Sequence, residues 1–527
     1  MLKPITAKVA NSSGSRGAPV ELPRPNPGDM MMALVFGWGL FCFFLVTFGG
    51  RLLARIAGLS SNKDLRELLL QGDQALAALM IGGSVVLVLA VYIFHKYPRF
   101  FLGSLPVSFS FANASWAPLH DVAFVMKYLT LVFLGVYLVL SLYPNFWRIL
   151  ATSYVRLFLV FTAWIAVVCF FVGGRFEDVW YAGVVACFVL SFSVFFLYEF
   201  NNRFGLKEFL NVLSWGAVIA VMIHWTAPAF SEEYIVNGRF QSYYDRATGF
   251  SVTLTPLIIV LFWRAMTEKD VQLKTFFTIV SLAGMLLILW SGSRSPIAAT
   301  LVGGGLLWLR FRSTVFLSMF ILAGTGIAIQ LLFQIGSGIE TDEITSRLQN
   351  AETGRFELWV QYFAIALESP IYGYGPSGLG FALAGSDIGS YLAGLGATEV
   401  EYEAVHNAYL AIFMRFGGIG FALYISLLVF AFYRAKQVLF SLRVPDHEKA
   451  LIVLPATLLV AISFTLIFED AVPGTGKGTL ESFILFSSMF ICQVYGTRLL
   501  NVYERPQARL ADLPTMNDLH VSVQSLE

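Results

Sequence analysis

Long apolar segments separated by shorter polar ones occupy most of the chain. A helix of roughly twenty apolar residues crosses a bilayer. About fourteen segments meet this condition, near 31–50, 75–95, 99–113, 121–143, 153–173, 178–200, 208–228, 249–266, 273–291, 295–312, 315–335, 407–434, 449–468 and 478–496. The third segment is short and contains Pro106, so a re-entrant segment is an alternative there. The pattern predicts an all-α polytopic membrane protein with about 12–14 transmembrane helices.

The composition is that of a membrane protein. Hydrophobic residues make up 57% of the chain and charged residues only 13%, a balance that a soluble domain does not need. The net charge of +1 argues against a nucleic-acid partner, which requires a basic surface. We expect no signal peptide, because a Pro-, Gly- and Ser-rich stretch precedes the first apolar segment. Four cysteines without a metal-binding spacing read as small core residues: Cys42, Cys169, Cys187 and Cys492.

Basic residues cluster in alternate connections between the candidate spans. Examples are Arg148 with Arg156, Arg203 with Lys207, Arg264 with Lys269, Arg310 with Arg312, and Arg434 with Lys436. The intervening loops, such as "SEEYIVNG" and "FEDAVPGTG", are acidic or poor in basic residues. By the positive-inside rule both termini are cytoplasmic. The segment 51–73 breaks the alternation, and its mixed charge predicts an amphipathic helix along the interface.

This orientation places three segments on the far side of the membrane: the loop 229–248, the corner 291–294 and the long connection 336–405. A connection of about seventy residues is far above the usual loop length and is generally functional or disordered. Within it, 354–369 predicts an amphipathic helix on the membrane face, with apolar residues Phe356, Trp359, Val360, Phe363 and Leu367. A glycine turn, "PIYGYGPSGLG", follows directly.

Few cationic side chains are expected on this far side. They are mainly Arg239, Arg246, Arg294, Arg347, Arg355, Lys477 and His406. Arginine binds phosphate through two parallel hydrogen bonds, and histidine changes protonation near neutral pH. Together they suit a diphosphate group and a proton transfer, although each arginine alone is better explained as a snorkelling anchor at a helix end. No HExxH, Walker or paired-cysteine motif occurs, so we expect no metal and no cofactor.

Four short motifs in order resemble one family. "RATGF" at 246–250, "SGSRSP" at 291–296, "GRFELW" with "YGYGPSG" from 354, and "HNAYLAIFMRFGGIG" at 406–420 resemble motifs of Wzy-type O-antigen polymerases and WaaL-type O-antigen ligases. Each motif is weak alone, but the ordered set on one predicted side of the membrane is specific. The resemblance covers roughly 246–434 and implies a GT-C-like membrane fold.

The resemblance implies a metal-independent inverting glycosyltransferase whose donor is a glycan on undecaprenyl diphosphate at the periplasmic face. We expect His406 to act as base or acceptor-positioning residue, with Arg294 and Arg355 as diphosphate clamps. Candidate substrate-binding residues are Arg246, Arg239, Asn407, Tyr409 and Arg415. The expected organisation is a cytoplasmic tail 1–30, N-terminal transmembrane helices 31–228, a polymerase/ligase-like membrane domain 229–497, and a cytoplasmic tail 498–527.

Three functions remain open at this point. Extra helices and extended tails favour polymerisation of O-antigen or exopolysaccharide repeat units, for which a chain-length regulator and a flippase are candidate partners. The first alternative is ligation of the glycan to the lipid A core, since the same donor site serves both reactions. A transporter or flippase is less well supported, because the charges concentrate at one face and the sequence shows no convincing internal repeat. Lys127 and His224 are the only intramembrane features that a transporter would explain better. In each case the expected location is the bacterial inner membrane.

Overall fold

Seven helices in the described part of the computed structural model are long and apolar enough to cross a membrane. The structure describes residues 152–173, 205–230, 234–314, 356–376, 406–469 and 479–504, except 237–238, 245 and 357. It also describes parts of 106–127, 178–189 and 317–325. The seven helices confirm an all-α polytopic membrane protein. The expected spans 31–50 and 75–95, most of 99–113, 121–143, 178–200 and 315–335, and the helix expected at 51–73, lie outside the described residues.

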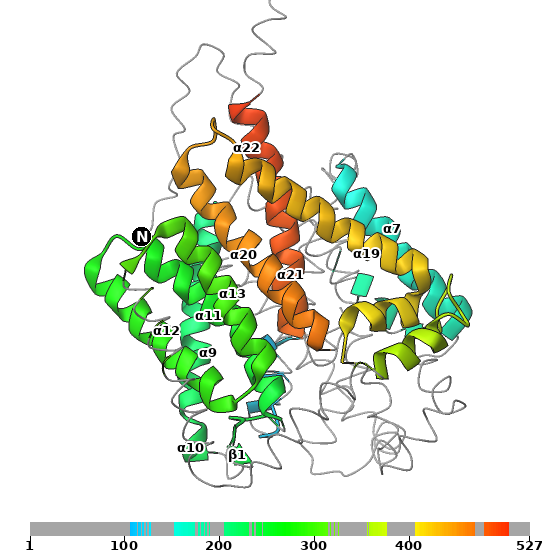
Figure 1. Cartoon of the computed structure of the whole chain (residues 1–527), viewed down its shortest axis with the longest axis horizontal. Coiled ribbons are helices and arrows are strands. Elements are labelled where there is room, and N and C mark those ends of the chain that lie inside the picture. The colour runs from blue at the N-terminus through cyan, green and yellow to red at the C-terminus, as the bar shows by residue number, and fades with distance from the viewer. Residues whose placement is uncertain are drawn as a thin grey trace, which may run out of the picture.

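The elements follow the expected spans closely (Figure 1). They are α7 (Ser153–Val168), the π-helix η2 (Cys169–Gly173), α9 (Leu206–Trp225), α10 (Ala227–Phe230), α11 (Ala247–Thr267), α12 (Val271–Ser291), α13 (Arg294–Phe311), α19 (Ala408–Phe440), α20 (Asp446–Phe468), α21 (Thr479–Phe490), the π-helix η3 (Ile491–Tyr495) and α22 (Gly496–Tyr503). Helix α13, expected as a span, is not among the seven apolar helices, because it contains three consecutive glycines and an arginine near each end.

A short β-ribbon lies in the segment 229–248, which the sequence predicts to be a loop. Strands β1 (Ile235–Val236) and β2 (Arg239–Phe240) pair antiparallel, with Ile235 opposite Phe240. The two residues between the strands in the sequence are Asn and Gly, the pair favoured in tight hairpins. The ribbon fixes the path of the chain that carries Arg239.

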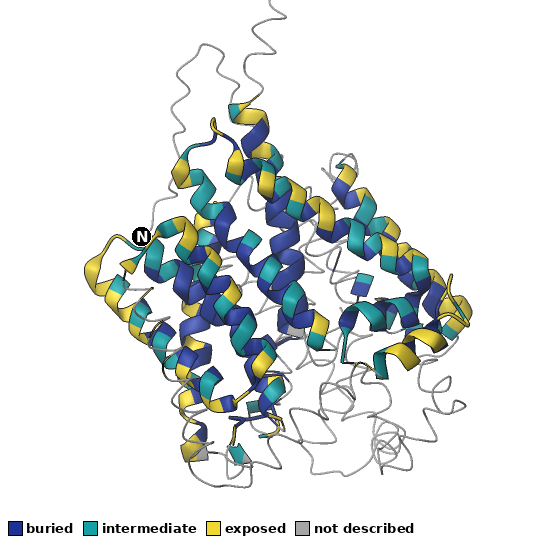
Figure 2. Cartoon of the chain, in the orientation of Figure 1, coloured by how far each residue is buried: buried dark blue, intermediate teal, exposed yellow. Residues whose placement is uncertain are grey.

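Helix α11 forms the centre of the bundle. Every residue from Phe250 to Trp263 is buried, as expected for a helix that is apolar on all sides. It packs against α9, α12, α13, α20 and α21. Small residues allow this close packing, since a side chain at Gly284 or Gly303 would collide with the isoleucines of α11. Figure 2 shows buried residues concentrated on the central helices of the bundle.

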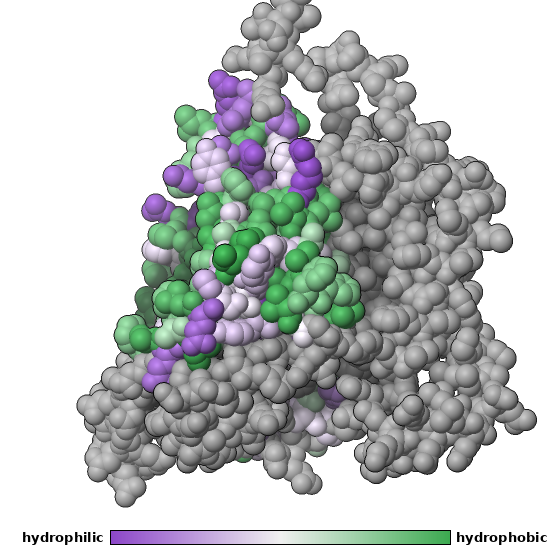
Figure 3. Space-filling view, turned by 90° about the vertical axis from the view of Figure 1, so that its right-hand side faces the viewer, coloured by the Kyte–Doolittle hydropathy of each residue, from purple (hydrophilic) through white to green (hydrophobic). Residues whose placement is uncertain are grey.

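Successive helices run in opposite directions, so their ends gather at two opposite ends of the bundle. The lower end in Figure 1 carries the end of α9, the ribbon, the end of α12, the start of α13 and the end of α20. Large apolar side chains in the middle of helices are exposed, for example Val160 of α7 at 54% and Ile279 of α12 at 59%. Figure 3 shows hydrophobic residues over the middle of one face, with hydrophilic residues gathered towards its top and bottom. This distribution fits a bilayer around the middle of the bundle.

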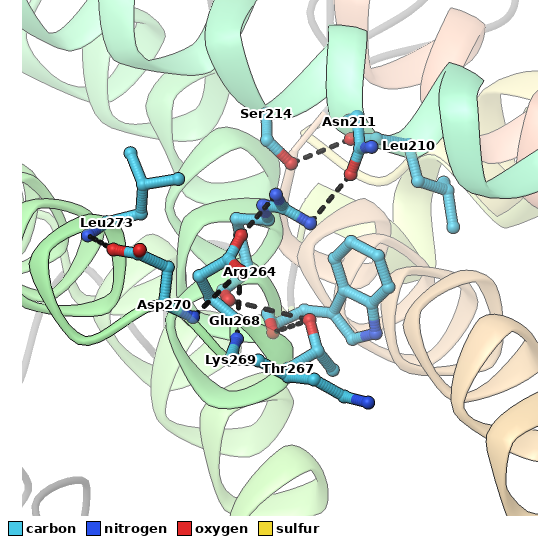
Figure 4. Close-up of polar contacts among 10 residues, drawn as sticks. Leu210, Asn211, Ser214, Arg264, Thr267, Glu268, Lys269, Asp270 and Leu273 are labelled. Atoms are coloured by element: carbon cyan, nitrogen blue, oxygen red, sulfur yellow. Dashed lines mark hydrogen bonds and ion pairs between the residues drawn. The ribbon is translucent and has the colours of Figure 1, made fainter.

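The turn between α11 and α12 holds a compact polar network, the Glu268 corner (Figure 4). Glu268 forms an ion pair with Arg264 and accepts hydrogen bonds from the main-chain N–H groups of Lys269 (2.8 Å) and Asp270 (3.2 Å). Arg264 also donates to Asn211 of α9 (2.7 Å). Burial acts to raise the pKa of Glu268, but the two hydrogen bonds and the charge of Arg264 hold that pKa below its ordinary value.

A helix covers 358–366, within the range expected from the sequence. Its buried residues are Tyr362, Ile365 and Ala366. Phe356, Val360, Phe363 and Leu367, on which the expected apolar face rests, are exposed at 66%, 55%, 49% and 53%. The apolar stripe therefore points away from the bundle, as a stripe in contact with lipid would. Cys169 and Cys492 are buried and form no disulfide, while Cys42 and Cys187 lie outside the described residues.

Candidate functional site

The corner between α12 and α13 is built by the "SGSRSP" motif. Gly292 ends α12 in the left-handed conformation, with φ of 62°, and its N–H donates to Leu289 O. The hydroxyl of Ser291 accepts a hydrogen bond from the N–H of Ser293 at 3.2 Å. Arg294 is then the first residue of α13 and is exposed. The motif thus places a guanidinium group beside the N-terminus of a helix, where partial positive charge favours anions.

Arg239 braces this corner from the β-ribbon. Its Nε donates to the main-chain oxygen of Ser291 at 2.8 Å, and its Nη2 donates to the hydroxyl of Ser293 at 3.0 Å. Arg239 was expected to bind substrate, a role that stays a prediction. The structure gives it a contact with the residues on either side of Gly292, so its position and that of Arg294 are coupled.

The His-Asn motif forms the start of α19. The side chain of Asn407 caps the helix by accepting a hydrogen bond from the N–H of Leu410 at 3.0 Å. His406, just before the cap, has a positive φ of 49°, which is uncommon for a residue other than glycine. The N–H of Ala408 donates to the main-chain oxygen of Glu469 at 3.1 Å, which ties the start of α19 to the end of α20.

Glu469 also joins the two motifs through its side chain. Its carboxylate oxygen Oε1 accepts a hydrogen bond from the hydroxyl of Ser295 at 3.1 Å. Arg294 and His406 lie next to the residues that Glu469 contacts, so 291–296 and 406–408 meet at one place. We name Glu469, the segments 291–296 and 406–408, and Arg239 together the Glu469 junction. Glu469 was not among the residues predicted from the sequence, where it is one acidic residue in a polar loop.

The glycine turn after the 358–366 helix locks onto α19. The N–H groups of Tyr374 and Gly375 donate to the main-chain oxygens of Met414 and Arg415, both at 2.9 Å. The N–H of Gly418 donates in return to Pro370 O at 2.7 Å. Backbones can approach this closely only without side chains, and a Cβ at Gly417 would overlap the carbonyl group of Ile371.

Helix α19 is broken at this lock. Gly417 has φ of 66° and ψ of −174°, outside the helical region, and the two parts of α19 run in different directions (Figure 1). The sequence predicts a single span over 407–434, with Arg415 two and a half turns below His406. Arg415 instead lies near the end of a short first part of the helix. The Trp164 indole N–H donates to Phe416 O at 2.9 Å and steadies the break.

The remaining predicted site residues differ in exposure and in their contacts. Arg246 is exposed at the start of α11, and Arg415 is half-buried beside the glycine turn. The hydroxyl of Tyr409 donates to Ser463 O of α20 at 3.0 Å, a contact that packs α19 on α20. Arg355, together with Arg347 and Lys477, lies outside the described residues. The structure therefore brings Arg239, Arg294, His406 and Asn407 into one connected set.

His224, which would have favoured a transporter, lies inside the bundle near the same end. It is fully buried, and its Nδ1 is 2.8 Å from the hydroxyl of Ser242. Its ring packs against Phe111 and Phe250, with centroid distances of 4.6 and 4.8 Å. These contacts explain His224 as a packed core residue. Lys127 is also buried.

Tyr374 in the glycine turn is a neutral hydrogen-bond donor. Burial and the neighbouring carboxylate of Glu368 raise the pKa of Tyr374 above its ordinary value. Its hydroxyl donates to Ile365 O at 2.9 Å and so ties the turn to the helix before it. Among the residues that the structure describes, no group of three or more His, Cys, Asp or Glu side chains is arranged to hold a metal ion.

A comparison with protein families tests the resemblance of this region. Residues 277–425 match the family model described as O-antigen ligase. These residues belong to the O-antigen polymerase/ligase superfamily. The match covers a little over a quarter of the chain and includes three of the four motifs, together with Arg294 and His406. A comparison with curated proteins finds no match. The family supports a membrane O-antigen ligase or polymerase, an enzyme of glycosyl transfer that acts on a lipid-linked glycan and an acceptor.

Proposed function

We propose that the protein transfers a glycan from an undecaprenyl-diphosphate-linked donor to an acceptor hydroxyl, and that the Glu469 junction is the place of transfer. The observation that carries this proposal is the meeting of the Arg294 and His406 motifs through Glu469. A family match and a motif order alone would not require these segments, more than one hundred residues apart, to lie together.

The chemistry needs two kinds of group at one position. The acceptor oxygen attacks the anomeric carbon, the bond from that carbon to the diphosphate oxygen breaks, and the acceptor loses its proton. Arg294, at the N-terminus of α13, stabilises the negative charge that grows on the leaving diphosphate. His406 takes the proton from the acceptor hydroxyl. Attack from the side opposite the leaving group inverts the anomeric centre.

The proposed reaction is polymerisation of repeat units of a surface polysaccharide, in which the acceptor is another lipid-linked glycan. The additional spans that the sequence predicts before residue 206 favour this form. The second candidate is ligation to the lipid A core, which is favoured by the description of the matching family as O-antigen ligase. The two reactions share the donor and differ only in the acceptor.

The experiment is a transfer assay with purified protein in detergent and a lipid-linked glycan as donor. With the donor alone, a polymerase produces longer glycans on the same lipid. With lipid A core added, a ligase produces glycan-bearing core instead. The absence of both products with every donor tested would refute the proposed function. The assay should proceed in excess chelator, since we propose a reaction without a metal, and a loss of rate that magnesium or manganese restores would contradict that part.

We also propose that the junction faces the periplasm. Cysteines in place of Ser337 and Ser386 should react with a membrane-impermeant thiol reagent in whole cells, in a protein whose Cys42 and Cys187 have been replaced. The native Cys169 and Cys492 are buried and contribute little background. Labelling only after lysis would reverse the orientation.

A further inference from the structure

Glu469 contacts the starts of two helices at once. Its main-chain oxygen accepts a hydrogen bond from Ala408, the first residue of α19, and its carboxylate accepts one from Ser295, the second residue of α13. Each contacted residue stands within two positions of a residue proposed for the reaction. A shift of Glu469 therefore moves Arg294 and His406 relative to each other.

The surroundings of the carboxylate indicate how its charge is used. The carboxylate of Glu469 accepts a hydrogen bond from a hydroxyl in the first turn of α13, where the helix dipole stabilises negative charge. The carboxylate thus joins the end of α20 to the start of α13, while the main-chain oxygen joins the end of α20 to the start of α19.

We propose that Glu469 is a positioning residue of the glycosyl transfer, which sets the spacing between the Arg294 and His406 motifs through its bond to Ser295. This role rests on the proposed function. A displacement of about 1 Å between reacting groups costs about a hundredfold in rate. The bond from Ala408 uses the main chain of Glu469 and persists in side-chain variants, so the side chain alone can be tested.

Three variants separate positioning from proton transfer by Glu469 itself. Glu469→Gln keeps an oxygen that accepts from Ser295 and should retain a near-normal rate and pH profile. Glu469→Ala and Ser295→Ala lose the bond, and each should lower kcat about a hundredfold with little change in donor KM. The double variant should be no slower than either single variant. If Gln is as slow as Ala and loses a limb of the pH profile, Glu469 is a base and the positioning role is wrong.

A second measurement does not depend on activity. In purified protein in detergent, Ser295→Ala and Glu469→Ala should each lower Tm, and the double variant should lower it by less than their sum. If the Tm shifts of the two single variants add up in the double variant while the wild-type protein is active, the positioning role is wrong and the proposed function stands. If the Tm shifts are non-additive but the wild-type protein transfers no glycan, the bond exists and the proposed function fails. The positioning role then fails with it. Glu268→Ala is the matched control, and it should lower Tm without changing kcat.

Discussion

Each end of the bundle has a glutamate directly after a helix, and the two glutamates have different kinds of partner. Glu268 and Glu469 each follow the last residue of a helix, and both have extended backbone conformations. The partners of Glu268 are Arg264 and the N–H groups of the next two residues. Glu469 instead accepts a hydrogen bond on its side chain from Ser295, 174 positions away in the sequence. A carboxylate satisfied by its neighbours shapes a turn, whereas one satisfied across the fold joins distant motifs.

The arginines at the two ends differ in the same way. Arg264 is bound to Glu268 and Asn211, and its guanidinium group lies 5.4 Å from the ring of Phe277. Arg294 is exposed at a helix N-terminus. Arg264 thus holds α11 to α9 and to Glu268, whereas the position of Arg294 beside a helix dipole suits an anion. Four predictions sharpen this contrast.

The largest effect is expected for His406→Ala. Removal of a general base lowers a rate by up to about four orders of magnitude. Transfer from the lipid-linked donor should fall to background in membranes with matched protein levels, while Tm is nearly unchanged because the helix cap Asn407 remains. Full activity of this variant would exclude His406 as the base.

The second effect is expected for Arg294→Lys, which keeps the charge and loses the planar two-pronged contact with phosphate oxygens. The rate should fall by about two to three orders of magnitude. The control, Arg264→Lys, should lower Tm and leave the rate per folded molecule unchanged. Equal transfer rates for the two variants would contradict the different roles assigned to Arg294 and Arg264.

The third effect concerns folding. Gly417→Ala places a side chain against the carbonyl group of Ile371 at a positive φ and should lower the free energy of unfolding by about 3 kcal/mol. The control is Gly305→Ala in α13, where a Cβ meets no atom within 4 Å. Urea titration in mixed micelles measures both. A neutral Gly417→Ala would mean that the glycine turn does not lock onto α19.

The smallest effect is a pH dependence of stability. The pKa of Glu268 is below its ordinary value of 4.5, so its ionised form stabilises the fold above about pH 4.5. This contribution should disappear as the pH falls through the lowered pKa. Glu268→Gln should therefore have a lower Tm than wild type at pH 7 and a smaller difference at the lowest pH. A constant difference across this range would contradict the lowered pKa.

Much of the fold could be predicted from the sequence, because the period and length of apolar segments determine where helices cross a membrane. The bounds of α12 agree with the expected 273–291 to within two residues. The break at Gly417 could not be predicted, since "RFGG" reads equally well as a continuous helix with small residues. The break depends on hydrogen bonds from a turn that lies about forty residues earlier.

The candidate site was predictable only in its parts. His406 and Arg294 stand out because cationic residues are few in the segments expected on the far side of the membrane. Glu469 does not stand out, because its role depends on contacts with Ser295 and Ala408 that no local pattern encodes. A helix was predicted over 354–369, and the structure has one over 358–366 with the expected apolar residues exposed. The residues that attach this helix to the bundle, such as Tyr362, are on its other face.

The most direct test of the central claim locates the bound lipid diphosphate. A polyprenyl diphosphate with a photoreactive group near the diphosphate is irradiated with the purified protein, and cross-linked peptides are identified by mass spectrometry. Labels should occur within 291–297 and 406–413 and should be displaced by excess unlabelled lipid diphosphate. Displaceable labelling concentrated at the Glu268 corner, or equal at both ends, would contradict the assignment of the Glu469 junction as the site of transfer.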